Sequence, residues 1–308
     1  MNASARFRPN GRHLALVGPT ASGKSSLALA LACSRDDIEI VTVDSMQVYR
    51  GMDIGTAKIT LEERHGIAHH MLDVLDVNQD STVAWYQSAA RDAIDEIHSR
   101  GKSVVMVGGT GLYIKAAIDE LNFPDTDPMV RHTLNKEAEE LGIDAMFARL
   151  EKLDPAAALA IDRANLRRII RALEVIEITG KPFTANLPRE ESARYPHARQ
   201  FGLVMDRELL SERIDERVNT MFDQGLVAEV QQLMNAGLLE GRTAQRALGY
   251  AQVLSHLQGE ISLDAAIEET KRATRQYARR QETWFSRDAR IKWISPRQPR
   301  LESILESL

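Results

Sequence analysis

The feature that most limits how this chain can fold is a glycine-containing loop near its N-terminal end. Residues 18–25 read Gly-Pro-Thr-Ala-Ser-Gly-Lys-Ser and fit the pattern G-x-x-x-x-G-K-[ST]. The apolar run His13–Val17 precedes this loop, and a run with helical character, Lys24–Cys33, follows it. In a strand–loop–helix unit of this kind, backbone N–H groups and the helix N-terminus can surround a phosphate. The pattern therefore predicts a phosphate-binding loop at the end of a strand.

Runs of Val, Ile and Leu recur along the chain and alternate with stretches of helical spacing. The expected strands are 13–17, 38–43, 103–107, 201–205 and 291–294, and the expected helices around them are 24–33, 83–99, 208–224, 227–235 and 263–285. Almost continuously apolar strands that alternate with helices are typical of a parallel sheet covered on both faces. We therefore expect an α/β fold, with a P-loop NTPase-like parallel sheet core flanked by helices.

No segment between residues 112 and 180 has the pattern of a strand. The helices expected there are 112–121, 128–141, 144–153, 155–161 and 166–179. The last of them has Ile169, Ile170 and Leu173 for a buried side, and Gly180 is a typical stop signal. We therefore expect two units: a core of residues 1–119 and 199–308, and an all-helical insertion domain of residues 120–198.

Composition limits the class of protein only broadly. With 308 residues and 44% apolar content, the chain can bury one large core, or an α/β domain and a smaller unit. The single cysteine, Cys33, excludes an internal disulfide or a Cys-based zinc site, and we expect it to be buried. No apolar run reaches the roughly 18 residues of a membrane span. Residues 1–12 lack the apolar stretch of a secretion signal, and we expect them to form a frayed end. We therefore expect a cytoplasmic protein. We also expect a monomer.

The loop also predicts particular contacts with a phosphate. Lys24 would neutralise the terminal phosphate, and Ser25 can ligate Mg²⁺. The loop does not decide whether the phosphate is a reactant or a leaving group. In ATPases and GTPases another strand ends in an aspartate that steadies the metal, whereas strand 103–107 runs into Gly108-Gly109-Thr110. This difference disfavours simple nucleotide hydrolysis.

A carboxylate follows the second strand. Strand 38–43 ends at Asp44, and ligands of open α/β sheets bind outside the carboxyl ends of the strands. Asp44 and Thr110 are therefore expected to face the phosphate loop, where a carboxylate can serve as general base, orient an amine or bind Mg²⁺ through water. His65, His69 and His70 are expected to be ordinary polar loop residues, because the set lacks further metal ligands.

Basic residues are clustered although the net charge of the chain is −5. Residues 271–292 hold eight Lys and Arg against one Glu and one Asp, and a second cluster, Arg163 with Arg167, Arg168 and Arg171, lies in the predicted insertion. Arginines near aromatic residues suit phosphate contact and stacking on unpaired RNA bases. A solvated basic helix face is the alternative interpretation of either cluster.

Together these motifs resemble the tRNA dimethylallyltransferases, also called tRNA isopentenyltransferases. The resemblance covers residues 13–294 in order, and its blocks are 18–25, 43–49, 51–58, 107–113, 168–174, 248–250 and 273–285. It implies transfer of a dimethylallyl group from dimethylallyl diphosphate to N6 of the adenosine 3′ to the anticodon, with release of diphosphate. The loop would then hold the donor's diphosphate rather than ATP.

The resemblance also implies site residues. Asp44 and Thr110 would be catalytic, Asp44 as the general base that takes a proton from the N6 amine. The donor's diphosphate would contact Arg217 and the loop residues Thr20, Ala21, Ser22, Gly23, Lys24 and Ser25, with Gly18 and Pro19 completing the loop and Mg²⁺ on Ser25. The residues expected to contact tRNA are Asp44, Ser45, Met46, Gln47, Thr110, Arg131, Arg167, Arg168, Arg171, Arg246, Gly249, Tyr250, Arg279, Arg280 and Gln281.

The chain departs from the family pattern at two places. Ala164-Asn165-Leu166 replaces a common Asn-Asp-Pro, although Asn165 can still cap the helix, and Ser286 replaces a common basic residue. Two functions other than dimethylallyl transfer stay open. The main alternative is a P-loop kinase for a small molecule or nucleoside, with ATP on the same loop. The other is a nucleotide-gated RNA-binding protein without group transfer.

Overall fold

The structure is a computed structural model that describes residues 12–186, 193–295 and 300–305. The expected frayed end, residues 1–12, therefore lies outside the described residues except for Arg12. The chain divides into two compact units, Met1–Ile118 with Tyr195–Leu308, and Asp119–Arg194. The division falls at residues 119 and 194, within a few residues of the boundaries expected from the sequence. We refer to the two units as the core unit and the insertion unit.

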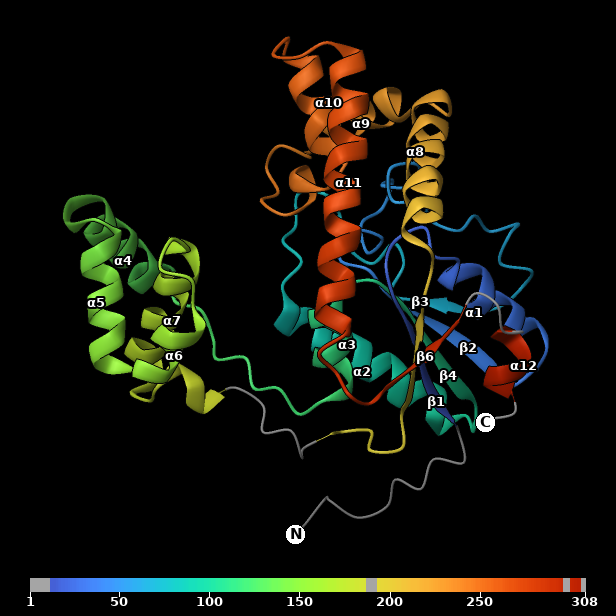
Figure 1. Ribbon diagram of the computed structural model, residues 1–308, viewed down its shortest axis with the longest axis horizontal. Helices are drawn as coiled ribbons and strands as arrows, with labels where there is room; N and C mark the ends of the chain where they lie inside the picture. The colour runs from blue at the N-terminus through green and yellow to red at the C-terminus, as the bar shows by residue number, and fades with distance from the viewer. Residues whose placement is uncertain (1–11, 187–192, 296–299, 306–308) are drawn as a thin grey trace. The chain divides into compact units, whose positions relative to one another are not determined.

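A parallel sheet of six strands organises the core unit (Figure 1). Its strands are β1 His13–Val17, β2 Ile38–Val43, β3 His69–His70, β4 Ser103–Gly108, β5 Arg199–Leu203 and β6 Ile291–Ile294. Their order across the sheet is β3-β2-β4-β1-β5-β6, and every pair is parallel. Val43 is paired with Gly108 and Leu16 with Val107, so the residues that follow β1, β2 and β4 meet at one edge of the sheet.

Helices cover both faces of the sheet, which is why its strands are apolar without alternation. The core-unit helices are α1 Lys24–Cys33, α2 Val83–Ser99, α3 Gly111–Ile118, α8 Arg207–Asp223, α9 Leu226–Asn235, η2 Ala244–Arg246, α10 Tyr250–Leu257, α11 Leu263–Phe285 and α12 Arg300–Leu305. Successive β1 residues point to opposite sides. Leu14 and Leu16 join a cluster with α1, and Ala15 and Val17 join a larger one with α2 and α3.

The insertion unit is helical in the part that the structure describes. Its helices are α4 Pro128–Leu141, α5 Ile143–Leu153, α6 Pro155–Ala160, α7 Leu166–Thr179 and the short η1 Phe183–Asn186. They pack around their own apolar cluster, to which α7 contributes Ile169, Ile170 and Leu173. Asn165 caps α7 by accepting a hydrogen bond from the Arg168 N–H at 3.1 Å, as expected from the sequence.

The P-loop-like parallel sheet with flanking helices is confirmed, and several details differ from expectation. Cys33 is exposed, because the buried stripe of α1 runs through Leu27, Ala28, Leu31 and Ala32 and leaves the last residue of the helix outside it. His69 and His70 form the edge strand β3 rather than a plain loop. Helices α10 and α12 were not predicted. Within the described segments, no helix has the length and apolar character to cross a membrane.

Candidate functional site

A cavity of about 390 Å³ lies at the carboxyl edge of the sheet, within the core unit. The phosphate loop, the ends of β2 and β4, residues 56–59, and helices α8 and α11 all contribute to its lining. Of the residues predicted for the site, the lining includes Thr20, Ala21, Gly23, Lys24, Ser25, Asp44, Gln47, Arg217 and Gln281. The cavity thus gathers side chains that are far apart in the sequence. His69, expected to be an ordinary loop residue, also lines it.

The phosphate loop has the backbone conformation of an anion site. Gly23 precedes α1 with a φ of 87°, and no side chain caps that helix, so its first N–H groups face the cavity without a capping partner. Gly18 has a φ of 140°, and a Cβ there would come within 3.2 Å of the Leu203 carbonyl oxygen. Glycine is needed at both positions because side chains rarely adopt these angles. The loop can therefore present N–H groups and a helix N-terminus to an anion.

Two cations face the same space, the buried Lys24 and the half-buried Arg217. Lys24 is only 8% exposed, and its Nζ donates to the Pro19 carbonyl at 2.5 Å. Burial lowers the pKa of Lys24 to about 7, helped by the positive charge of Arg217, while Asp44 acts in the opposite direction. Burial also lowers the pKa of Arg217. Two cations that line one cavity, one of which lowers the pKa of the other, indicate that the site is built to receive an anion.

Asp44 lies across the cavity from this loop and is held in a defined orientation. Its Oδ1 accepts hydrogen bonds from the N–H groups of Met46, at 2.8 Å, and Gln47, at 3.3 Å. The Ser45 N–H donates to Thr110 Oγ1 at 3.3 Å, which ties the end of β2 to the start of α3. The structure thus brings Asp44 and Thr110 to the same edge of the sheet, where Asp44 lines the cavity and Thr110 is not among the lining residues. The second carboxylate oxygen of Asp44 lies outside these bonds.

Helix α11 forms another wall and links the loop to β4. The buried Gln281 accepts from the Thr20 N–H at 2.8 Å and donates to the Gly109 carbonyl at 2.9 Å. The Tyr277 hydroxyl hydrogen-bonds to the side chains of Thr110 and Gln281, and burial, together with Asp44, raises the pKa of Tyr277 to about 12. Gln281 was expected to contact tRNA. Its amide is engaged inside the protein in this structure, and the tRNA contact stays a prediction.

The wall formed by residues 53–58 is held from outside the cavity by Glu229 of α9. The Glu229 carboxylate accepts from the N–H groups of Asp53 at 3.2 Å, Ile54 at 2.7 Å and Gly55 at 3.3 Å. The next residue, Thr56, lines the cavity, and its carbonyl accepts from Gln47 Nε2 at 3.0 Å and from Arg217 Nη2 at 3.4 Å. Glu229 therefore supports a segment that bonds directly to two cavity residues.

Tyr250 completes this support from α10. Its side chain is 0% exposed, and its hydroxyl donates to Glu229 Oε1 at 2.5 Å. Gly55 is required opposite it, because a Cβ at that position would overlap the Tyr250 ring. Tyr250 was predicted to contact tRNA, but in this structure its side chain faces the protein interior. No sequence signal points to Glu229, since 174 to 176 residues separate it from the N–H groups that it binds.

The arginines predicted to contact RNA fall into two groups. Arg246, Arg279 and Arg280 of the core unit and Arg167 and Arg168 of the insertion unit are exposed. Arg131 and Arg171 instead bind the buried carboxylate of Glu174, at 2.6 and 2.8 Å, so they also stabilise the insertion unit. Of the remaining predicted contacts, Ser45 and Met46 are half-buried, and Gly249 is buried with a φ of 86°.

A parallel sheet with a phosphate loop, two cations and an aspartate that line one cavity defines a P-loop protein with the groups needed for transfer from a phosphorylated donor. The model of the IPP transferase family matches residues 47–288. The tRNA dimethylallyltransferase of Thermobifida fusca is 56% identical over 285 residues, covering 91% of this chain and 89% of that protein. The chain therefore belongs to the IPP transferase family.

Solved structures agree with this assignment. The tRNA isopentenylpyrophosphate transferase of Bacillus halodurans has a TM-score of 0.70 and 40% identity, over 96% of this chain and 94% of that one. A eukaryotic dimethylallyltransferase described as acting on tRNA has a TM-score of 0.78 and 28% identity, over 92% of this chain and 74% of that one. Because both alignments cover more than 90% of this chain, they extend over the core unit and the insertion unit.

Proposed function

We propose that this protein transfers a dimethylallyl group from dimethylallyl diphosphate to N6 of the adenosine 3′ to the anticodon in tRNA. The observation that carries the proposal is the pairing of a cationic phosphate loop with an aspartate across one 390 Å³ cavity. An anionic leaving group can lie at one side of this cavity, while an amine meets a base at the other. The names of two similar proteins, a tRNA dimethylallyltransferase and a tRNA isopentenylpyrophosphate transferase, support transfer of such a group to tRNA.

The reaction is a displacement at the allylic carbon. The N6 nitrogen forms a bond to C1 of the dimethylallyl group, the bond from C1 to the diphosphate oxygen breaks, and diphosphate departs with the electron pair. The proton lost from N6 passes to the carboxylate of Asp44, whose orientation is fixed by the Met46 and Gln47 N–H groups. Lys24, Arg217 and the N–H groups of the loop stabilise the charge that develops on the leaving diphosphate.

Thr110 and Tyr277 complete the acceptor side of the cavity in this proposal. The Thr110 hydroxyl, which bonds to the Ser45 N–H and to Tyr277, would hydrogen-bond to the incoming adenine. The Tyr277 hydroxyl is neutral at physiological pH, as an ordinary tyrosine is, and can donate a hydrogen bond there. An adenine must leave its stack to enter such a cavity, and unpaired loop nucleotides make this least costly.

Ser25 fits a magnesium ion in the way that P-loops hold one. It is exposed at the start of α1 and lines the cavity. No cluster of three or more His, Cys, Asp or Glu that could hold a metal occurs among the residues described, so phosphate oxygens and water would supply most ligands. When bound, Mg²⁺ would neutralise part of the diphosphate charge. Lys24 and Arg217 would neutralise a further part of that charge.

The exposed arginines supply the RNA contacts of this proposal. Arg246, Arg279 and Arg280 of the core unit, with Arg167 and Arg168 of the insertion unit, would bind phosphates of the anticodon stem-loop. Each such contact adds affinity that falls as salt rises. We further propose that the protein works as a monomer in the cytoplasm, where its tRNA substrate is present.

One assay tests the proposal against the kinase alternative. The protein is incubated with an unmodified anticodon stem-loop RNA, Mg²⁺ and either dimethylallyl diphosphate or ATP, and the nucleosides are analysed by mass spectrometry. We expect one adenosine per RNA to gain a dimethylallyl group with the first donor and no product with ATP. A phosphorylated product with ATP, or unmodified RNA with the allylic donor, would exclude the proposed reaction.

A further inference from the structure

The 390 Å³ cavity continues beyond the phosphate loop, along one face of β2. Asp44, which directly follows β2, lines it together with Thr42 and Ile40, and residues two apart on a strand point to the same side of the sheet. Because a strand rises about 3.3 Å per residue, Thr42 lies about 7 Å from Asp44 along β2, and Ile40 about 13 Å from it. We call the part of the cavity along Thr42 and Ile40 the β2 arm.

The β2 arm is mostly apolar. Val107 of β4 is paired with Thr42, His69 of β3 is paired with Ile40, and both line the cavity. Ile40 is 1% exposed and Val107 is 6% exposed, and the half-buried Ile59 adds a further aliphatic side chain to the lining. Such a surface stabilises a hydrocarbon by removing it from water. The β2 arm therefore fits a carbon chain rather than a phosphate.

The chemistry of the proposed reaction directs the donor's carbon chain into the β2 arm. Displacement at C1 requires the N6 nitrogen and the departing diphosphate oxygen on opposite sides of that carbon, so the rest of the chain must extend sideways. The phosphate loop takes the diphosphate, and Asp44 meets the amine. The β2 arm begins beside Asp44 and is apolar, so the chain beyond C1 lies there.

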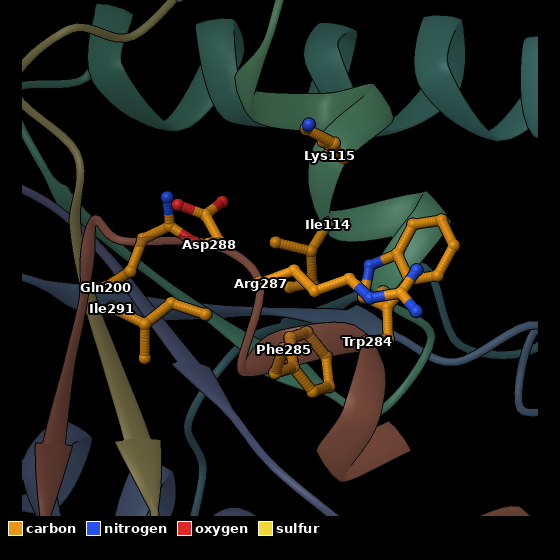
Figure 2. A pocket seen from close by; sticks show the side chains of 9 residues that line it. Ile114, Lys115, Gln200, Trp284, Phe285, Arg287, Asp288 and Ile291 are labelled. Atoms are coloured by element: carbon orange, nitrogen blue, oxygen red, sulfur yellow. The ribbon is translucent and has the colours of Figure 1, made fainter. Parts of the chain in front are cut away.

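A second cavity of about 190 Å³ in the core unit does not compete for this chain (Figure 2). Figure 2 shows Lys115, Arg287 and Asp288 around it, and charged groups lose hydration when an alkyl chain covers them. Its lining includes no residue of the phosphate loop and none of β2. A short chain whose diphosphate lies on the phosphate loop therefore enters the β2 arm.

Two polar groups interrupt the apolar lining of the β2 arm. Thr42 is 4% exposed, and its hydroxyl forms no hydrogen bond with a residue that the structure describes. His69 Nδ1 donates to the Ile67 carbonyl at 2.9 Å. Burial lowers the pKa of His69, so the ring is neutral at neutral pH and its Nε2 carries a lone pair. Within the described part of the chain, no group donates to that nitrogen.

These two groups need a polar partner. A polar atom enclosed by apolar side chains costs free energy unless it is hydrogen-bonded, and the two methyl groups of a dimethylallyl chain cannot bond to it. A hydroxyl on one of those methyl carbons could donate to His69 Nε2 and accept from the Thr42 hydroxyl. Four bonds separate that oxygen from C1, which is about 5 Å in an extended chain and comparable with the distance from Asp44 to Thr42.

We propose that this protein also uses a hydroxylated donor, in which one terminal methyl group of dimethylallyl diphosphate carries a hydroxyl, and that Thr42 and His69 select it. The inference rests on the proposed function, because the same loop and the same aspartate act on both donors. The N6 nitrogen bonds to C1, the bond from C1 to the diphosphate oxygen breaks, and the proton passes to Asp44. The hydroxyl takes no part, so a hydroxylated product forms in one step without an oxidant.

Competition between two donors tests the proposal. Stem-loop RNA and Mg²⁺ are incubated with equal amounts of dimethylallyl diphosphate and either the E or the Z isomer of the hydroxylated donor. The two products differ by one oxygen atom and are counted by mass spectrometry, and their ratio gives the ratio of the two kcat/KM values. For one of the isomers we expect at least as much hydroxylated product as dimethylallyl product.

Variants test whether the two polar groups cause this selection. Thr42→Val keeps the shape of the side chain and removes its hydroxyl, and His69→Phe keeps a ring and removes the acceptor. Each should lower the ratio of hydroxylated to dimethylallyl product about 2- to 10-fold. Thr270→Val changes a buried threonine of α11 outside the cavity and should leave the ratio unchanged. Dimethylallyl transfer in the same reaction establishes that each variant is folded.

The outcomes separate this proposal from the proposed function. If both isomers give less hydroxylated than dimethylallyl product, the β2 arm does not select a hydroxyl. The same conclusion follows if Thr42→Val and His69→Phe leave the product ratio unchanged. In either case the dimethylallyl product leaves the proposed reaction standing, whereas no product from any donor would overturn the reaction itself.

Discussion

The two walls of the donor cavity are built in different ways. The phosphate loop is one continuous segment whose own glycines, N–H groups and lysine form the anion site. The wall of residues 53–58 lines the cavity through Thr56 and Ala57. Glu229 of α9 and Tyr250 of α10 hold this segment in place. The first wall is specified locally, whereas the second depends on residues far along the chain. We expect substitutions in the phosphate loop to lower kcat/KM for dimethylallyl transfer. Substitutions behind the second wall should instead raise KM for dimethylallyl diphosphate.

The largest effect is expected from Lys24→Ala. It removes a buried positive charge from the leaving-group site, so kcat/KM for dimethylallyl transfer should fall by about 10²- to 10³-fold or more. Affinity for the stem-loop RNA should stay within about threefold, because Lys24 faces the donor side. Steady-state transfer rates and RNA anisotropy check this. An equal loss of RNA affinity would contradict the division of the cavity into donor and acceptor sides.

Glu229→Gln tests the second wall. The amide keeps the shape but loses the charge and one acceptor, so the N–H groups of residues 53–55 should hold their positions less well. We expect KM for dimethylallyl diphosphate to rise about tenfold with a smaller change in kcat. Glu212→Gln, on the exposed side of α8, is the matched control and should be neutral. A loss confined to kcat would place Glu229 in the chemical step instead.

The pH dependence of donor binding tests the first wall without a mutation. Without an anion, the pKa of Lys24 is about 7, and a bound diphosphate should raise it. Binding is then favoured when Lys24 is protonated, so the affinity for diphosphate should fall about fivefold from pH 7 to pH 8. Titration calorimetry in two buffers of different ionisation enthalpy should also show proton uptake. Binding without proton uptake at pH 8 would mean that Lys24 is already fully charged.

Tyr250→Phe should have the smallest effect of the four. It removes a single hydrogen bond to Glu229 and preserves the ring that packs over Gly55. We expect KM for the donor to rise about two- to threefold, with RNA affinity unchanged. A loss of RNA affinity with an intact donor KM would instead support the direct tRNA contact that the sequence predicted for Tyr250.

The sequence predicted the parts of this fold that are locally encoded. Helices such as 83–99 and 263–285 follow from periodicity, and the phosphate loop from its own pattern. Strand β3 was not predicted because two residues are too short to give a strand pattern. The exposure of Cys33 was not predicted because its position relative to the buried side of α1 depends on how the helix packs. Asp44 and Thr110 could be placed at one edge because parallel strands bring their carboxyl ends together.

The supports of the site could not be predicted in the same way. Gln281, Tyr277 and Glu229 act through contacts that join distant segments, and only the folded chain defines these contacts. Tyr250 shows the consequence. Its motif indicated a functional residue, and the structure places its side chain behind the cavity wall, with its hydroxyl on Glu229.

The most direct test of the central claim, that the phosphate loop binds a departing diphosphate, is to count both products of one reaction. The protein is incubated with stem-loop RNA and dimethylallyl diphosphate, and released diphosphate and dimethylallyl-adenosine are measured over time. We expect one diphosphate per modified adenosine, at the same rate, with ATP neither required nor consumed. Diphosphate released without RNA modification, or modification that requires ATP hydrolysis, would contradict this account.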